Sequence, residues 1–351
     1  YKRQVKRTLR QAPPPAAYDL TELQRDANRK YAYSAKETLS LMQSLYERHK
    51  LLTYPRTDSR YISDDVVSTL PERLKSVMVD EYRDLARAIL MKRPLQTRFL
   101  VDNARVTDHH AILPTEEQPE LFRLSGPERN IYDLVVRRFL AVLLPPCEYE
   151  ETRLTLTVGG ETFTARGKIM KEPGWRAAYG LFLLEEDEEE EGEEREQSLP
   201  PLRQGDSVEV LSARVSTGKT APPKRYTEAT LLTAMEHPPT QGMDRAQGKI
   251  LEETGGLGTP ATRADIIEKL FSAFYIERRG RELVPTSKGR QVVELAPADL
   301  RSAQLTARWE KRLGDIARGL ERESAFVSEM RGYASRLVGE VKTSDAVYRH
   351  D

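Results

Sequence analysis

Tyr54 and Arg56 are the two residues whose types and spacing most clearly suggest chemistry. They lie in the segment LLTYPRTDSRYIS, residues 51–63, in which an apolar, β-prone lead-in precedes Pro55. A residue before proline favours extended geometry, and side chains two apart on an extended chain project from one face. A tyrosine can attack phosphorus, and an arginine can neutralise phosphate oxygens. The pair predicts a tyrosine that becomes esterified to phosphate, whereas spacing alone also allows a tyrosine that only packs or stacks.

Helical segments lead into and follow this tyrosine. Capping-box patterns at residues 19–22 and 34–37 predict two helices immediately before it, the first over residues 20–31. Apolar residues at helical spacing predict three more helices, over residues 64–78, 81–91 and 127–144.

The pattern then becomes β-like. Alternation of polar and apolar residues over 151–158 and 161–169, with Gly159-Gly160 between them, predicts a hairpin. Residues 207–215 predict another strand.

The last part of the chain is again helical by pattern. Three helices followed by two short extended pieces around Gly280 and a further helix give the outline of a winged helix-turn-helix. The predicted helices are at residues 227–236, near 245–253, and at 260–271, 287–295 and 323–342.

Composition limits the class of protein. The 351 residues are enough for two or three domains, and no apolar run approaches the ~20 residues that span a bilayer. Cys147 is the single cysteine, which excludes internal disulfides and Cys-ligated zinc clusters. We therefore expect a reducing, cytoplasmic setting and no membrane.

The formal net charge of zero conceals two opposite regions. Residues 185–196 contain ten acids and one arginine, a charge of −9, so the rest of the chain carries +9. We expect the acidic run to be a solvated loop and the basic body to bind polyanions.

Four segments resemble the type IA DNA topoisomerases, in particular the bacterial topoisomerase III kind. LLTYPRTDSRYIS is similar to the active-site segment of that family. Three further segments occur in the family's order: residues 20–47, TDHHAILPT at 107–115, and GGLGTPATRADIIEKL at 255–270.

The resemblance implies a multidomain α+β fold. It has a helical domain that carries the tyrosine, a β-rich arch domain and a winged-helix-like helical base domain. We expect the N-terminal end of the arch at residues 1–12, the tyrosine domain at 13–147, the arch with its acidic loop at 148–226, and the base domain at 227–351.

The same resemblance implies roles for individual residues. Tyr54 would cleave single-stranded DNA through a 5′-phosphotyrosine link, pass another strand and reseal the first without ATP. Arg56 would stabilise the phenolate and phosphoryl oxygens, unless it only forms a surface ion pair with Asp58. His109 would assist at the scissile phosphate, or else be a half-buried histidine that holds a carbonyl. His110 projects oppositely in an extended chain, so the two histidines are no metal pair.

Asp58, Thr262 and Arg263 are the expected DNA-binding residues. Thr262 and Arg263 occupy the first turn of a helix that Thr259-Pro260 should open, and a helix N-terminus offers amide groups to phosphate. The alternative is a plain capped helix. The loop is no nucleotide P-loop, because the Gly-Lys-Ser/Thr ending is missing.

The resemblance also implies groups that this sequence does not show. No Asp-x-Asp-x-Glu triad lies outside the acidic run, and the chain starts at Tyr1 without methionine. We therefore expect a fragment without the family's Toprim domain, which would bind the Mg²⁺, and no metal site in this chain. Expected partners are single-stranded DNA, the Toprim domain and a helicase, and we expect a monomer in the bacterial cytoplasm, associated with the nucleoid. Alone, the fragment should bind single-stranded DNA with little or no relaxation.

Three alternatives to a topoisomerase remain at this point. A non-catalytic DNA-binding module could be built on the winged helix of residues 227–295, and a structural scaffold is a further option. A tyrosine recombinase is disfavoured, because its tyrosine lies near the C-terminus and Tyr54 lies near the N-terminus.

Overall fold

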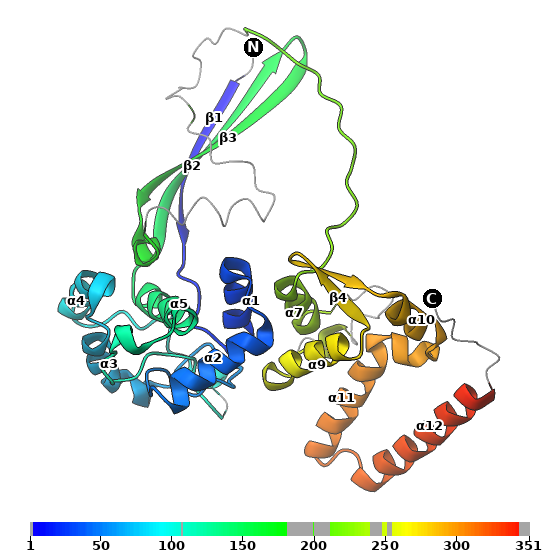
Figure 1. The fold of residues 1–351 in the computed structure, drawn as a ribbon. Helices are drawn as coiled ribbons and strands as arrows, with labels where there is room; N and C mark the ends of the chain where they lie inside the picture. Colours follow the sequence, from blue (N-terminus) through cyan, green and yellow to red (C-terminus); the bar gives the residue numbers. More distant parts are fainter. Residues whose placement is uncertain are drawn as a thin grey trace. The chain divides into compact units, whose positions relative to one another are not determined.

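The computed structural model describes residues 3–106, 108–180, 199, 211–238, 248–250 and 255–343 (Figure 1). The chain divides into two compact units. This division is coarser than the four predicted domains, whose boundaries stay a prediction. Unit 1 is Tyr1–Tyr18, Ser44–Pro55 and Ser59–Pro222; unit 2 is Asp19–Gln43, Arg56–Asp58 and Pro223–Asp351.

A three-stranded antiparallel sheet forms one part of unit 1. Its order is β1 (Arg3–Ala12), β2 (Cys147–Val158) and β3 (Glu161–Glu172). Gly159 and Gly160 connect β2 to β3 with φ of 60° and 91°, the positive values that a two-residue type I′ turn needs. The predicted hairpin is confirmed, and the long-range partner of β2 is the N-terminal segment.

The prediction of a strand at residues 207–215 is wrong for residues 211–215, the part of this range that the structure describes. Residues 211–215 form no strand, and residues 207–210 lie outside the described residues, as does the acidic run at 185–196.

Helix α5 (Gly126–Val142) forms the centre of the helical part of unit 1. It begins with a capping box between Ser125 and Glu128, and its apolar face is buried, with Ile131 and Phe139 at most 1% exposed. The predicted helix over residues 64–78 is a 3-10 turn, η1 (Asp64–Thr69), that continues as α3 (Leu70–Ser76). The helix predicted over residues 81–91 is confirmed as α4 (Arg83–Met91), which follows the 3-10 turn η2 (Asp80–Tyr82).

Helices α1 (Leu20–Tyr31) and α2 (Ala35–Glu47) confirm the two capping patterns before the tyrosine. The Asp19 side chain accepts the Glu22 N–H at 2.7 Å, and the Ser34 hydroxyl accepts the Glu37 N–H at 3.0 Å. Both contacts satisfy amides that a helix start would otherwise leave unpaired. Helix α2 begins in unit 2 and ends in unit 1, so it leads the chain to Tyr54.

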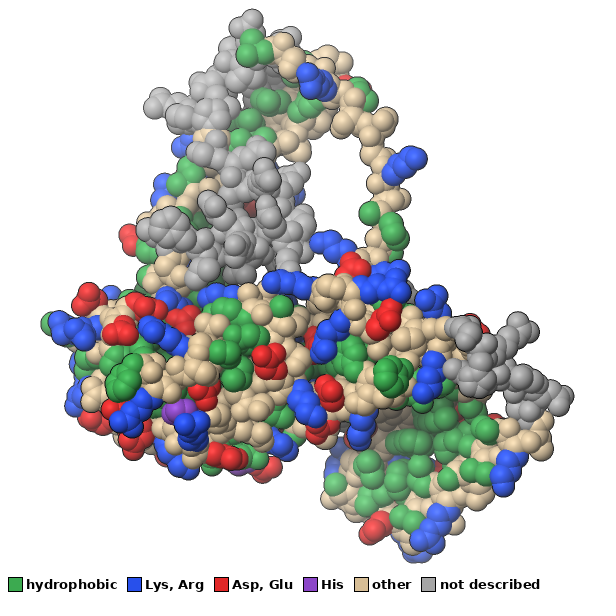
Figure 2. All heavy atoms as spheres, viewed as in Figure 1, with side chains coloured by type: hydrophobic (Ala, Val, Ile, Leu, Met, Phe, Trp, Pro, Cys, Tyr) green, Lys and Arg blue, Asp and Glu red, His purple; other side chains and the backbone are tan. Residues whose placement is uncertain are grey.

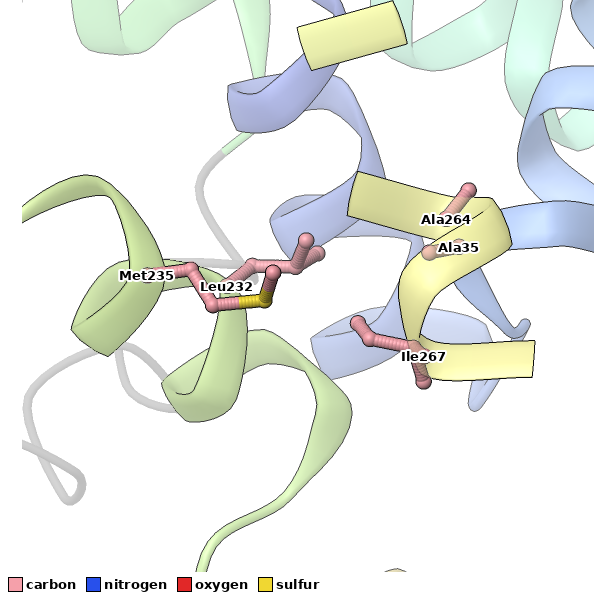
Figure 3. Packing of buried hydrophobic residues seen from close by; sticks show 5 residues of the cluster. All are labelled: Ala35, Leu232, Met235, Ala264 and Ile267. Atoms are coloured by element: carbon pink, nitrogen blue, oxygen red, sulfur yellow. The ribbon is translucent and has the colours of Figure 1, made fainter. Parts of the chain in front are cut away.

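Unit 2 has a small apolar core beneath the start of α2. Helices α7 (Glu228–Glu236) and α9 (Pro260–Ser272) pack there (Figure 3). The buried cluster consists of Ala35, Leu232, Met235, Ala264 and Ile267.

A hairpin follows these helices, β4 (Ile276–Arg279) with β5 (Glu282–Pro285), and then α10 (Ser287–Leu295). Together these elements confirm the winged-helix outline, although the helix near residues 245–253 lies largely outside the described residues, of which 248–250 are helical.

Two helices complete unit 2. Helix α11 (Ala303–Ala317) was not predicted, and α12 (Glu323–Thr343) confirms the last predicted helix. Apolar side chains lie exposed over both helices (Figure 2), among them Leu313 at 45% and Val338 at 53%. No helix in the described part of the chain is long and apolar enough to cross a bilayer.

Candidate active site

The segment before Tyr54 is held by the histidine segment. The Thr53 N–H donates to the Leu113 carbonyl at 2.9 Å, and the Thr53 hydroxyl accepts the Leu113 N–H at 2.9 Å. The Thr115 N–H donates to the Leu51 carbonyl at 3.0 Å. These three hydrogen bonds fix the alignment of the two segments. It places residues 109–115 beside the chain that presents Tyr54.

The ring of Tyr54 is half-buried between two other rings of unit 1. Its centroid lies 4.3 Å from that of His109, with 34° between the planes. On another side, Tyr46 makes an edge-to-face contact at 5.6 Å and 86°. Such aromatic contacts restrict the ring position. The structure thus brings together Tyr54 and His109, two of the three predicted catalytic residues.

Tyr46 is a contact that the sequence analysis missed. It lies in the last turn of α2, and the chain then turns back at Lys50, whose φ is 58°. The aromatic residue eight positions before Tyr54 was visible, but only this left-handed turn brings it against the Tyr54 ring.

His109 is exposed and His110 is half-buried. The alternative of a half-buried histidine therefore does not describe His109. Its position beside the phenol ring, with the two ring planes tilted by 34°, suits a group that acts on the same bound phosphate, which remains its predicted role.

Arg56 and Asp58 belong to unit 2, on either side of a buried residue. Thr57 is 1% exposed, and its carbonyl accepts the Leu20 N–H at 3.1 Å, where α1 begins. Arg56 and Asp58 are both exposed. Because Tyr54 and Arg56 fall in different units, the pairing of phenol and guanidinium stays a prediction.

Arg263, in contrast, is buried inside unit 2, with 1% exposed. Its guanidinium donates to the Thr21 hydroxyl at 2.9 Å, to the carbonyls of Leu257 at 3.2 Å and Gly258 at 3.3 Å, and to the Gly255 carbonyl. Burial lowers the pKa of Arg263, although an arginine stays charged. The arginine therefore holds the glycine loop against α1.

Thr262 is exposed at the first turn of α9. Its hydroxyl accepts the Thr259 N–H at 2.9 Å and lies 3.1 Å from the Thr259 hydroxyl. The two threonines cap the helix reciprocally, as the sequence predicted for Thr259.

A buried carboxylate supports the turn between α2 and Tyr54. Glu128 accepts the Ser44 hydroxyl at 2.6 Å and the Ser125 hydroxyl at 2.7 Å, and His49 Nε2 lies 3.4 Å from it. Burial by itself would raise the pKa of Glu128, but the hydrogen bonds from Ser44 and Ser125 and the charge of His49 outweigh it and lower that pKa to about 2.

Glu128→Gln should therefore destabilise the chain at neutral pH, and the difference should vanish in acid. The folded pKa lies below the ordinary value of 4.5, so the stabilisation is complete above pH 4.5 and is lost as the pH falls towards 2. We expect on the order of 2 kcal/mol at pH 7 from urea unfolding of both proteins. Glu72→Gln, at an exposed ion pair with Lys75, is the control and should cost less than about 0.5 kcal/mol. An undiminished Glu128→Gln difference at pH 2 would contradict this account.

The described residues offer no set of ligands for a metal. Nowhere among them do three or more His, Cys, Asp or Glu side chains group closely enough to hold an ion. Mg²⁺ prefers several oxygen ligands in near-octahedral geometry. The described side chains of this site therefore do not fit the implied Mg²⁺.

The architecture matches a solved structure. Full-length topoisomerase I from Thermotoga maritima superposes with a TM-score of 0.68 at 24% identity, over 96% of this chain and 52% of that one. The fold is therefore the type IA topoisomerase fold that the sequence predicted.

Sequence comparison gives the family. The family described as DNA topoisomerase matches residues 3–328. The chain is 50% identical over 349 residues to DNA topoisomerase 3 of Bacillus licheniformis and 49% identical over 350 residues to that of Bacillus subtilis, in each case over 99% of this chain. This chain belongs to the DNA topoisomerase family. It spans about half of the length of these curated relatives, 48% of each.

Proposed function

We propose that Tyr54 attacks a backbone phosphate of single-stranded DNA. The tyrosine O–P bond forms while the P–O3′ bond breaks, the phenol loses its proton and the 3′ oxygen gains one. The 5′-phosphotyrosine link retains the energy of the phosphodiester, so the reverse attack by the 3′ hydroxyl reseals the strand without ATP. The observation that supports this most is the Tyr54 ring held between His109 and Tyr46 in a chain of this family.

His109 and Arg56 would act on the same phosphate. His109 lies against the Tyr54 ring and can donate a hydrogen bond to a phosphoryl oxygen or to the leaving oxygen. Arg56 is exposed and would neutralise the phosphoryl oxygens when it reaches them. Passage of a second strand through the break would relax negative supercoils or separate linked rings.

The glycine loop at residues 255–258 and the start of α9 would bind the DNA backbone. Thr262 and Asp58 are exposed and available for direct contacts. Arg263, which the sequence analysis expected at the phosphate, is buried, so its contribution would be to hold the loop that presents the helix N-terminus.

The remaining expectations extend beyond this chain. We propose that Mg²⁺ is supplied by a Toprim domain, in the half of such proteins that this chain does not span, and that this chain alone binds single-stranded DNA with little relaxation. The enzyme would act as a monomer on DNA in the bacterial cytoplasm, with a helicase as a candidate partner.

Labelled oligonucleotides test the reaction. The chain is incubated with a 5′-labelled or a 3′-labelled single strand, with and without a Toprim-containing N-terminal piece and Mg²⁺, and then denatured. We expect the 3′ label to stay on the protein when the N-terminal piece is present. Trapping of the 5′ label would reverse the proposed polarity. Tight binding without any adduct would favour the non-catalytic winged-helix module, whose α7, α9 and β4–β5 hairpin the structure contains.

His109 should contribute to the rate beyond its ring contact. Because His109→Phe keeps an aromatic ring beside Tyr54 but has no N–H, we expect it to slow adduct formation about 10- to 100-fold. The measurement is a single-turnover time course with the 3′-labelled strand. A wild-type rate for His109→Phe would show that the histidine only packs against the tyrosine.

A further inference from the structure

One face of the three-stranded sheet carries a row of three cations. In the strand register, Lys6 pairs with Arg153, and Arg153 pairs with Arg166. Residues directly opposite one another on antiparallel strands project from the same face of the sheet. All three side chains are exposed. The row therefore crosses the full width of the sheet with one positive charge on each strand.

The same face is basic beyond this row. Two residues further along, the register aligns Thr8, Glu151 and Lys168, and the next row on this face contains Arg10. Glu151 is the one acidic residue in these rows. Its carboxylate oxygens lie 3.3 Å from Arg10 Nε and 3.4 Å from Arg153 Nη2. Over these three rows, five cations thus accompany one carboxylate.

The opposite face has a different character. It carries most of the large apolar side chains of the sheet, since the intervening rows contain Val5, Leu9, Leu154, Leu156, Phe163 and Ile169. Arg7, which pairs with Thr152, also lies on this opposite face, so the register places most but not all of these cations on the face that bears Lys6, Arg153 and Arg166.

Like charges directly opposite one another weaken a sheet. The row of Lys6, Arg153 and Arg166 therefore destabilises the three-stranded sheet unless a bound anion neutralises it. Neighbouring strands lie about 4.8 Å apart, so the three side-chain origins span roughly 10 Å. A duplex presents one phosphate per ~1.7 Å of its axis and releases counterions when cations replace them. Several phosphates of one duplex are thus within reach of such a row.

The chemistry of this face favours a duplex over a single strand. Sites for single strands combine a basic surface with aromatic side chains on which bases stack. On the described part of this face, the aromatic residue is Tyr149, which is half-buried and has Lys168 Nζ 4.8 Å from its ring centroid. Phosphate contacts without base stacking are typical of sequence-independent backbone binding.

From this arrangement we infer that the face bearing Lys6, Arg153 and Arg166 binds the backbone of a double-stranded DNA segment, at a site made of residues other than those around Tyr54. The identification of the polyanion as DNA depends on the proposed function. The site would hold a duplex part of the substrate while a single strand occupies the tyrosine.

The test uses the full chain with Lys6→Gln, Arg153→Gln and Arg166→Gln together. Binding to a blunt 20-base-pair duplex and to a 20-nucleotide single strand is followed by fluorescence anisotropy between 50 and 200 mM NaCl. We expect duplex affinity to fall at least about tenfold, and the slope of log Kobs against log salt to become shallower by about 2 to 3. Affinity for the single strand and trapping of the 3′ label should stay within about twofold.

Arg87→Gln, Lys92→Gln and Arg93→Gln together are the matched control, because they remove the same charge from three exposed positions of unit 1. This control should change duplex affinity less than about twofold. The thermal midpoint of the sheet variant should not fall, since repulsion is removed. An unchanged duplex affinity, an equal loss in the control, or a loss confined to the single strand would overturn the inference. If the wild-type chain formed no adduct with the 3′-labelled strand, the proposed reaction would be contradicted instead.

Discussion

Tyr54→Phe should abolish the covalent adduct between protein and DNA while leaving the fold and DNA binding intact. Phenylalanine retains the ring that contacts His109 and Tyr46, so the packing at 4.3 and 5.6 Å is preserved. It lacks the oxygen that forms the bond to phosphorus. We expect adduct formation to fall at least about 1,000-fold, with the affinity for a single strand within about twofold of wild type. The measurement is the 3′-label trapping assay with the N-terminal piece and Mg²⁺ present.

Tyr46→Phe is the matched control for this substitution. The two substitutions each remove one hydroxyl from the same edge-to-face pair of rings, but only Tyr54 is proposed to react. The Tyr46 variant should therefore form the adduct within a few-fold of the wild-type rate. Adduct formation by Tyr54→Phe, or equal loss in both variants, would remove Tyr54 from the role of nucleophile.

Local signals in the sequence were sufficient for most elements. The capping boxes of α1 and α2 depend on side chains three residues apart, and the β2–β3 hairpin depends on alternation around Gly159-Gly160. Helix α11 was missed, although Ser302 caps it by accepting the Gln304 N–H at 3.1 Å. That cap lacks the acidic residue at the third position by which the other boxes were found.

Contacts between distant segments could not be derived in this way. The place of His109 beside Tyr54 depends on hydrogen bonds between Thr53 and Leu113, sixty residues apart. Sequence patterns report the exposure of one element at a time, so only the family resemblance grouped these two residues beforehand. The basic row depends equally on the pairing of β1 with β2, which no local pattern specifies.

Arg263 shows how a motif can mislead about a role. An arginine in the first turn of a helix after a glycine loop is a reasonable phosphate ligand. Its burial could not be read from the motif, because three carbonyls of the loop and the distant Thr21 hydroxyl together supply the acceptors. A buried guanidinium needs such acceptors, and the loop must adopt a specific backbone path to provide them.

Gly256→Ala should disrupt this loop and lower the free energy of unfolding of unit 2. Gly256 has φ of 82°, and an added Cβ would lie 2.2 Å from the Met235 carbonyl oxygen, which accepts the Leu257 N–H at 2.6 Å. The Met235 carbonyl oxygen and the Gly256 Cα are backbone atoms and cannot move aside as a side chain could, so α7 and the loop would have to separate. We expect a loss of more than about 3 kcal/mol, from the strained φ and the broken packing together. In a Trp175→Phe background, Trp309 is the remaining tryptophan and reports the urea unfolding of unit 2.

Gly255→Ala separates these two causes. Gly255 has nearly the same φ, 80°, but nothing lies within 4 Å of its added Cβ. It should lose only the cost of the left-handed conformation, roughly 1–2 kcal/mol. Single-strand affinity should fall with Gly256→Ala and stay near wild type with Gly255→Ala, since only the former displaces the carbonyls that Arg263 holds beside α9. Equal effects of the two substitutions would mean that backbone conformation, and not the close approach of the loop to α7, determines the stability of this site.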